Sequence, residues 1–343
     1  MKERLTYNEV TEIFVRVNSL GAKLRSSDLA LAQITAKSRN SLKVFQDFQQ
    51  QCAQIGFDLD LGIYLRNLIV FATGQSRFLT VGSLTIDALQ KAWKESCEGM
   101  MFALNFVKNN AGIDSPALLS SPFLLVTLGF LGHRRDYQIE PDESVRLRYW
   151  VLAANAKGHY SRGSSETILD QDLATLRQGG ATELIDRLRL QVGRLDISSD
   201  ELEGRNQRSA LFKTMFLAFR NAGAKDWRSN LAIALDHSGV QHRLQFHHIF
   251  PKAVLTKSKY TAREADDIAN LSFIGGKTNR GISDKPPSDY LPPLIAKVGQ
   301  DAFAAQCIPT DDSSLQLDTY KIFLTQRREL IAQRLNEFLG DPL

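Results

Sequence analysis

The 343-residue sequence has little cysteine, no low-complexity tract and no long apolar run. Its three cysteines, Cys52, Cys97 and Cys307, are odd in number and far apart, which excludes a disulfide framework and a paired-cysteine zinc knuckle. The longest apolar stretch, residues 121–132, is shorter than the ~20 residues that a membrane helix needs. The first ten residues, MKERLTYNEV, lack the apolar segment of a secretion signal. We therefore expect a cytoplasmic protein with no membrane partner.

Apolar residues are abundant, at 43%, and they recur at helical spacing along most of the chain. The pattern predicts helices over residues 5–20, 42–55, 61–73, 86–109 and 116–132, with others following up to residue 222, around 230–235 and over 320–339. These segments favour a mostly α-helical protein built as a helical bundle.

The pattern changes after His237. Residues 241–250 and 270–274 read as short strands, and residues 277–281 read as a helical turn. Two strands and a short helix predict a ββα module embedded in the bundle. The expected organisation is a first segment 1–40, a helical domain 41–236, the ββα module 237–290 and a C-terminal helical segment 291–343 that packs on the module.

The formal net charge of +4 permits a polyanionic partner without requiring one. Basic residues gather in 205–228 and 252–285, on both sides of the expected strands. Arg327, Arg328 and Arg334 of the last predicted helix could lie along DNA or form a solvated face. His133, His159 and His237 lie far in sequence from the motif described below and are expected to be surface or capping residues.

The chemistry-bearing residues of the module are the run HHIFP (247–251), Asn270 and the run NRG (279–281). A neutral imidazole is a natural base for activating water near pH 7, and a divalent cation can stabilise the charge of phosphodiester cleavage. Adjacent strand residues point to opposite faces, so His247 and His248 can divide into a metal ligand and a base where the strand ends. The amide oxygen of Asn279 suits Mg²⁺ or Mn²⁺ better than Zn²⁺.

This arrangement resembles the HNH, or ββα-metal, nucleases (His-Me fingers). HHIFP looks like their first motif, and the run NRGISDKPPS (279–288) is similar to the HNH domain of the large CRISPR effector nuclease. The resemblance implies that His248 is the general base and that His247 and Asn279 are metal ligands. Asn270 would hold the loop that carries the base. A carboxylate often stands in this family where His247 stands here, which leaves the metal identity open.

The resemblance extends to GmrSD-type restriction endonucleases. The runs RNQRSALFKTMFLAF (205–219) and GAKDWRS (223–229) are similar to their C-terminal nuclease half, as is FLTQRRELIAQRLNEFL (323–339). The opening IFVRVNSLGAKLRSSDLALAQI (13–34) is similar to the end of their N-terminal NTPase domain, so residues 1–40 would be a remnant of it. The family's nucleotide-binding motif, of the DGQQR type, has no match. The family implies restriction of foreign or modified phage DNA and an NTPase domain or subunit as partner.

Other interpretations of the same residues remain open. The two histidines could be satisfied in a core, or could bind structural zinc together with His242. Asn270 could simply begin a strand, and Asn279 could be a helix-end residue. Lys252, Lys277 and Arg280 are expected to bind DNA backbone phosphate, with solvated surface charge as the alternative. GGKT (275–278) is not a phosphate-binding loop, because position 271, where its first glycine belongs, is leucine.

The sequence thus predicts a metal-dependent DNA endonuclease acting in defence against foreign DNA, with Mg²⁺ or Mn²⁺ as cofactor. The alternative from another class is a non-catalytic DNA-binding or regulatory subunit that needs a separate NTPase partner. A nuclease that acts on RNA, or as a toxin, would use the same site.

Overall fold

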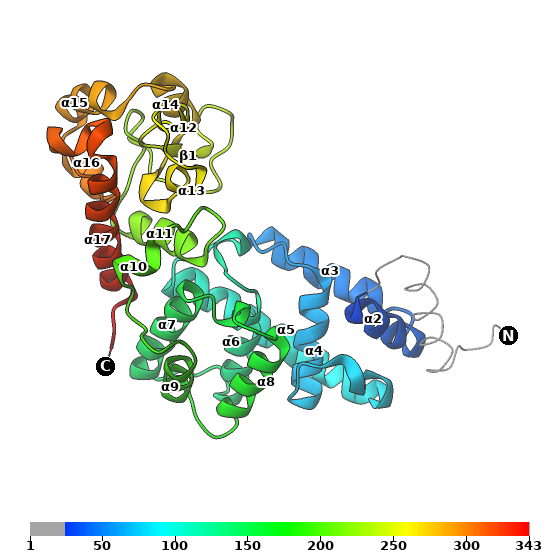
Figure 1. Ribbon diagram of the computed structural model, residues 1–343. Coiled ribbons are helices and arrows are strands. Elements are labelled where there is room, and N and C mark those ends of the chain that lie inside the picture. The colour runs from blue at the N-terminus through cyan, green and yellow to red at the C-terminus, as the bar shows by residue number, and fades with distance from the viewer. Residues whose placement is uncertain (1–24, 343) are drawn as a thin grey trace. The chain divides into compact units, whose positions relative to one another are not determined.

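The computed structural model describes residues 25–342, apart from the side chains of Leu79 and Thr80, and divides into two compact units (Figure 1). Among the described residues, the first unit comprises 25–154 and 158–191, and the second comprises 155–157 and 192–342. The predicted helix 5–20 and most of the predicted segment 1–40 lie outside the described residues. The predicted boundaries at residues 236 and 290 fall inside the second unit.

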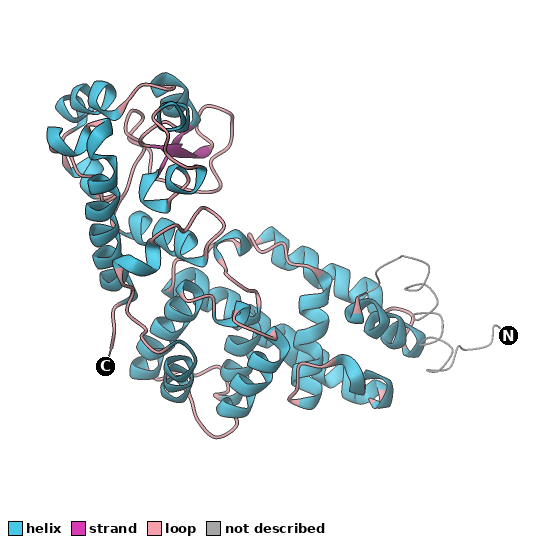
Figure 2. Cartoon of the chain, viewed as in Figure 1, coloured by secondary structure: helices cyan, strands magenta, loops and turns pink. Residues whose placement is uncertain are grey.

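Helices make up nearly all the regular structure, which confirms the mostly α-helical fold (Figure 2). The helices that lie mainly in the first unit are α2 (Ser26–Lys37), α3 (Ser41–Gln54), α4 (Leu61–Thr73), α5 (Ile86–Asn110), α6 (Phe123–Arg134), α7 (Pro141–Ala156), α8 (Ser165–Leu176) and α9 (Ala181–Val192). Three 3₁₀ turns join them: η1 (Phe78–Ser83), η2 (Pro116–Leu118) and η3 (His159–Ser161). None of the helices within residues 25–342 combines the length and apolar composition needed to cross a bilayer.

The core of the first unit forms where α4, α5 and α6 pack together. Gly99 on α5 and Gly129 on α6 allow this packing, because a Cβ on Gly129 would lie 2.8 Å from the Gly99 carbonyl oxygen. His159 is buried, with Nε2 2.7 Å from a carboxylate oxygen of Asp172, which is also buried. The expectation that His159 is a surface or capping residue is therefore wrong, since a buried imidazole needs such a partner.

The second unit contains the only sheet found among the described residues, a two-stranded antiparallel one. Its elements are α10 (Ser199–Leu202), α11 (Ala210–Asn221), β1 (Leu244–His248), α12 (Lys252–Lys257), α13 (Ala262–Ala265), η4 (Ile268–Asn270), β2 (Leu271–Gly275), α14 (Gly276–Ile282), α15 (Pro287–Val298), α16 (Asp301–Ala304), η5 (Asp312–Leu315), η6 (Leu317–Thr319) and α17 (Tyr320–Leu339). Figure 2 shows the sheet in magenta among these helices. The two strands and the short helix α14 follow one another in the predicted order.

Aromatic packing holds the sheet against α11. Phe273 of β2 is 1% exposed and contacts the rings of Phe212, Phe216 and Phe219 on one side of that helix. The register pairs Phe273 with Phe246 of β1, so the same cluster covers both strands. Because neighbouring strand residues point to opposite faces, His247 lies on the face of β1 away from Phe246, where it packs against Trp227 and Tyr290.

The long helix α17 anchors the module through a buried arginine. Arg327 is fully buried and donates to the backbone carbonyl oxygens of Ala269, Gln306 and Cys307. Burial lowers the pKa of Arg327 to about 10. Arg328 forms a 2.6 Å ion pair with buried Asp267. Neither guanidinium is therefore free to lie along DNA, because both bind groups of the chain itself.

The predicted helix around residues 230–235 is wrong. Asn230 has a left-handed backbone, with φ 59°, and Lys225 pairs with Ala232 in an isolated antiparallel bridge. The Asp226 amide also donates to the Leu231 carbonyl oxygen at 2.8 Å. These contacts fold residues 224–233 back into a tight loop, a tertiary arrangement that apolar spacing in the sequence does not report.

Candidate active site

The two predicted metal ligands lie together. His247 Nδ1 is 2.8 Å from the side-chain oxygen of Asn279, although 32 positions separate them in the chain. Strand pairing explains the approach, because His247 lies opposite Ser272 of β2 and α14 follows β2 directly. The Asn279 amide nitrogen donates to the side-chain oxygen of Gln245 at 2.7 Å, which orients the amide oxygen toward the imidazole.

His247 is 3% exposed and is held on its other side by Tyr290 of α15. Its Nε2 lies 3.1 Å from the Tyr290 hydroxyl, which donates to the Ile249 carbonyl oxygen at 3.0 Å. Burial lowers the pKa of His247 to about 4, opposed by the bond to Asn279 and assisted by the nearby charge of His248. The imidazole is therefore neutral at pH 7, so its nitrogen lone pair can bind a cation.

His248, the last residue of β1, is half-buried and points to a different partner. Its Nε2 lies 3.1 Å from one carboxylate oxygen of Asp266, and its side chain is 31% exposed. The second carboxylate oxygen of Asp266 accepts from Lys252 Nζ at 2.7 Å. An imidazole that donates from Nε2 to a carboxylate has Nδ1 as its basic atom. Sequence reasoning missed Asp266, because 18 residues separate it from His248 and it stands outside the quoted motifs.

Asn270 makes structural contacts. Its side-chain oxygen accepts from the Phe250 amide at 2.9 Å, and its nitrogen donates to the carbonyl oxygens of Phe250 and Ala265. These bonds fix the loop directly after His248, the contact that the family resemblance implied. Asn270 is fully buried. By its contacts it is a positioning residue and does not act on the reacting atoms.

The three predicted phosphate-binding residues have different surroundings. Lys252 is engaged by Asp266, as described above. Arg280 is exposed and donates to the Val240 carbonyl oxygen at 3.3 Å. Lys277 is exposed, and its ammonium group has no ion pair or hydrogen bond to any residue of 25–342. Lys277 and Arg280 thus lie on the outer side of α14, the helix that carries Asn279.

Asp226 fixes the start of α14, and sequence reasoning did not single it out. One of its carboxylate oxygens accepts from the Gly275 amide at 2.7 Å, and the other accepts from the Thr278 hydroxyl at 2.8 Å. The second oxygen also accepts from the amide and hydroxyl of Ser229. Burial opposes ionisation, but these hydrogen bonds outweigh it and the pKa of Asp226 is lowered. The carboxylate thus joins the loop 224–233 to the helix of Asn279.

Replacing Asp226 by alanine is expected to destabilise the second unit by about 3 kcal/mol, because it leaves buried donors on Gly275 and Thr278 without an acceptor. Calorimetry should show an unfolding transition at lower temperature. Because the folded-state pKa is lowered, the stabilisation from Asp226 is present above the unfolded pKa and is lost as the pH falls through the folded value. The exposed Asp236→Ala variant is the control, and equal transition temperatures for both variants would contradict this role.

No cluster of three or more His, Cys, Asp or Glu side chains suited to a metal ion occurs within residues 25–342. The candidate metal ligands are therefore one imidazole and one amide, both neutral. The predicted zinc alternative with His242 is not supported by its surroundings, because the neighbouring histidines bind Asn279, Tyr290 and Asp266 instead.

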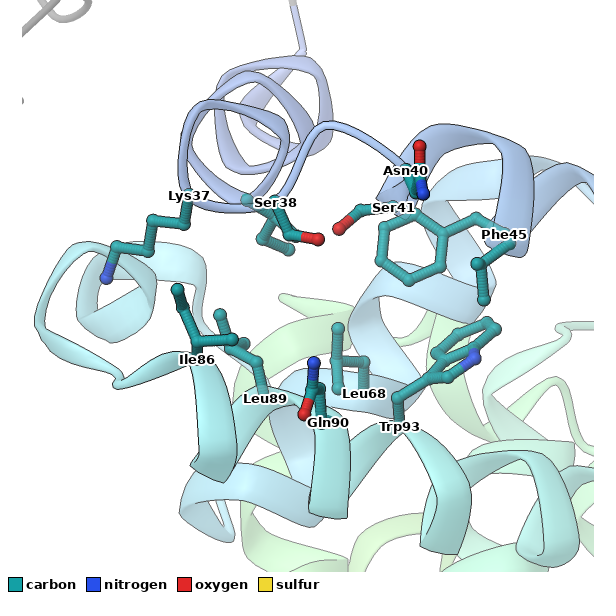
Figure 3. A pocket seen from close by; sticks show the side chains of 12 residues that line it. Lys37, Ser38, Asn40, Ser41, Phe45, Leu68, Ile86, Leu89, Gln90 and Trp93 are labelled. Atoms are coloured by element: carbon teal, nitrogen blue, oxygen red, sulfur yellow. The ribbon is translucent and has the colours of Figure 1, made fainter. Parts of the chain in front are cut away.

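A hollow in the first unit has fewer polar groups that could bind a ligand. Its volume is about 280 Å³, and its lining from α2, α3, α4 and α5 is mainly apolar, including Phe45 and Trp93 (Figure 3). Lys37, the one charged residue of this lining, donates to the carbonyl oxygens of Gly82 and Leu84. With that ammonium engaged, the hollow has no free charged group with which to select a ligand.

Comparison with known proteins adds little to these observations. No protein-family model matches the chain. An uncharacterized protein of the archaeon Methanocaldococcus jannaschii is 22% identical over 313 residues, which cover 85% of this chain and 51% of the relative. The chain therefore spans about half the length of this relative.

Proposed function

We propose that this protein is a metal-dependent endonuclease of the HNH type that hydrolyses phosphodiester bonds in DNA. The observation that carries the proposal is the 2.8 Å approach of His247 Nδ1 to the Asn279 oxygen, with His248 next in the chain and bound to Asp266. Two strands and a helix bring these side chains together in the order that the HNH resemblance implies.

The spacing of the two candidate ligand atoms fits a small divalent cation. His247 Nδ1 and the Asn279 oxygen lie 2.8 Å apart, close enough for these two residues together to hold one divalent cation such as Mg²⁺. Remaining positions would be open to phosphate oxygens and water. Two neutral ligands bind Mg²⁺ weakly, so we expect the cation to bind mainly together with DNA, whose phosphates add negative charge.

The hydrogen bonds of His247 support the same fit. The Tyr290 hydroxyl has one proton, and it donates this proton to the Ile249 carbonyl oxygen. In that arrangement the Nε2–H of His247 donates to the Tyr290 hydroxyl oxygen. Nδ1 then presents a lone pair to the Asn279 oxygen, which is also an acceptor. Two acceptors at this distance repel, so in this tautomer a cation held by both atoms would be stabilising, whereas in the other neutral tautomer Nδ1–H donates to the Asn279 oxygen.

The proposed reaction divides the work among these residues. His248 Nδ1 takes a proton from a water that attacks phosphorus, while Asp266 holds the ring through Nε2. The bond from phosphorus to the 3′ oxygen breaks, and that oxygen takes a proton from solvent, leaving a 5′ phosphate and a 3′ hydroxyl. A bound divalent cation supplies Lewis-acid stabilisation of the developing negative charge. Lys277 and Arg280 position the DNA backbone without reading its sequence.

The test is cleavage of supercoiled plasmid by the full chain in Mg²⁺ or Mn²⁺, with a chelator as control. The proposal expects nicked or linear product carrying 5′ phosphates. DNA binding without cleavage in either cation would instead support the non-catalytic DNA-binding subunit.

The proposed role in restriction of foreign or modified DNA, and the proposed NTPase partner, rest on the GmrSD resemblance alone. A plaque assay in cells carrying this gene tests that role.

Asp266→Ala is expected to lower kcat for DNA cleavage by about 10–100-fold, because His248 loses the carboxylate that orients it. KM for DNA should change little, since Asp266 is not placed on the substrate. Steady-state kinetics on plasmid DNA measure both constants, and Asp318→Ala, an exposed carboxylate of the same unit, is the control. A rise in KM with unchanged kcat would show that Asp266 acts in some other way.

A further inference from the structure

A larger hollow lies beside the candidate active site, within the second unit. Its volume is about 510 Å³, which is within the range of small-ligand sites. One wall is the loop around residues 222–230, and the other consists of residues 298–305 at the end of α15 and in α16. Neither the predicted metal ligands nor the predicted base line it.

Two cations of this lining are unengaged. Lys225 and Arg228 are exposed, and their side chains have no ion pair or hydrogen bond to the residues that the structure describes. By contrast, Lys252 and Arg328 of the same unit are paired with carboxylates. An ammonium and a guanidinium on one wall form a favourable site for a phosphate group.

The rest of the lining suits the flat ring of a base. Val298 is 37% exposed and stands with Ala302 on the opposite wall, which gives an apolar surface. Trp227 is 1% exposed, and its indole nitrogen has no hydrogen-bond partner among the described residues. A buried donor without an acceptor is costly, so a ligand oxygen or a water that reached it would be stabilising. Asp301 adds an exposed acceptor for an amino group.

The hollow is fixed relative to the candidate active site. Asp226 binds both its own loop and the start of α14, as described above. Trp227 packs edge-on against His247, with ring centroids 5.7 Å apart. Arg228 lies over Gly281 of α14, because a Cβ at that glycine would be 2.4 Å from the guanidinium. One loop thus contributes a wall of the hollow and supports both metal ligands.

We propose that this hollow binds one nucleotide of the DNA strand next to the cleaved phosphodiester. Lys225 and Arg228 bind its phosphate, and the base lies against Val298 and Ala302. This inference rests on the proposed nuclease function, and it adds a nucleotide subsite that the sequence analysis did not assign.

The first test measures binding without cleavage. Calorimetry in the presence of a chelator would titrate 2′-deoxyadenosine 5′-monophosphate, and separately inorganic phosphate, into the full chain. Lys225→Ala/Arg228→Ala and Ala302→Phe, which fills the hollow, should each weaken nucleotide binding by about tenfold or more. Lys257→Ala removes an exposed cation elsewhere in the unit and should bind as the unaltered protein does. Absence of binding, equal affinity in all variants, or equal affinity for phosphate alone would overturn the proposal.

A second measurement separates this inference from the proposed function. In steady-state plasmid cleavage, the two hollow variants should raise KM for DNA more than they lower kcat. Cleavage that is insensitive to both variants would overturn the subsite while leaving the nuclease standing. Nucleotide binding that depends on Lys225 and Arg228, in a protein that does not cut DNA, would support the subsite and end the nuclease proposal.

Discussion

His248→Ala is expected to slow DNA cleavage by ~10²–10⁴-fold, because the attacking water loses its general base. The side chain is 31% exposed and contacts Asp266 alone by hydrogen bond, so its removal should leave the fold intact. Cleavage rates on supercoiled plasmid at saturating Mg²⁺ or Mn²⁺ measure the effect. Added imidazole should restore part of the rate, since a free ring can enter the half-exposed space and accept the proton.

The matched control is His242→Ala. His242 is exposed and belongs to the same unit, and its ring has no hydrogen bond to the described residues. Its removal should leave the rate unchanged. Undiminished cleavage by a clean preparation of His248→Ala would end the assignment of the base, and with it the proposed mechanism.

Asn279→Ala is expected to lower cleavage by about 100-fold or more at low cation concentration, because one of two protein ligands is lost. Raising the Mn²⁺ concentration should recover part of the activity, as mass action fills the weakened site. Asn279→Asp keeps the shape and adds a charge. It should therefore cut DNA at a lower half-saturating cation concentration than Asn279→Ala does.

Cleavage measured over a range of Mn²⁺ concentrations separates these variants. Asn221→Ala, an exposed amide at the end of α11, is the control and should follow the unaltered protein. If Asn279→Ala required no more cation than the control, the amide would not be a ligand. The approach of His247 to Asn279 would then be a structural hydrogen bond.

Local signals explain why the sequence could predict a mostly helical fold with two short strands. The helices around residues 42–55, 61–73 and 320–339 carry regular apolar spacing, and the structure has α3, α4 and α17 there. The turn from residues 270–274 into 277–281 was visible because Gly275 and Gly276 end a run of apolar residues. The false helix at 230–235 has such spacing too, but Asp226 and the bridge to Lys225 override it.

Long-range partners could not be predicted in the same way. Asp266 contacts His248 from 18 positions away in the chain, and Tyr290 contacts His247 from 43 positions away. Neither residue belongs to a sequence motif that predicts a functional site. Asp226 reaches Thr278 across 52 positions. A residue type and its neighbours in sequence do not reveal such contacts, which depend on how β1, α14 and α15 pack.

The sequence by itself determined which kinds of groups were present: two adjacent histidines at a strand end and an asparagine on the helix after the second strand. It determined this much because strand and helix periodicity act over short distances along the chain. Only the tertiary structure decided which histidine is buried against Asn279 and Tyr290 and which is held by Asp266. That division depends on what covers each face of β1, because Phe246 faces α11 while His247, on the opposite face, packs against Trp227 and Tyr290, and packing between distant segments sets it.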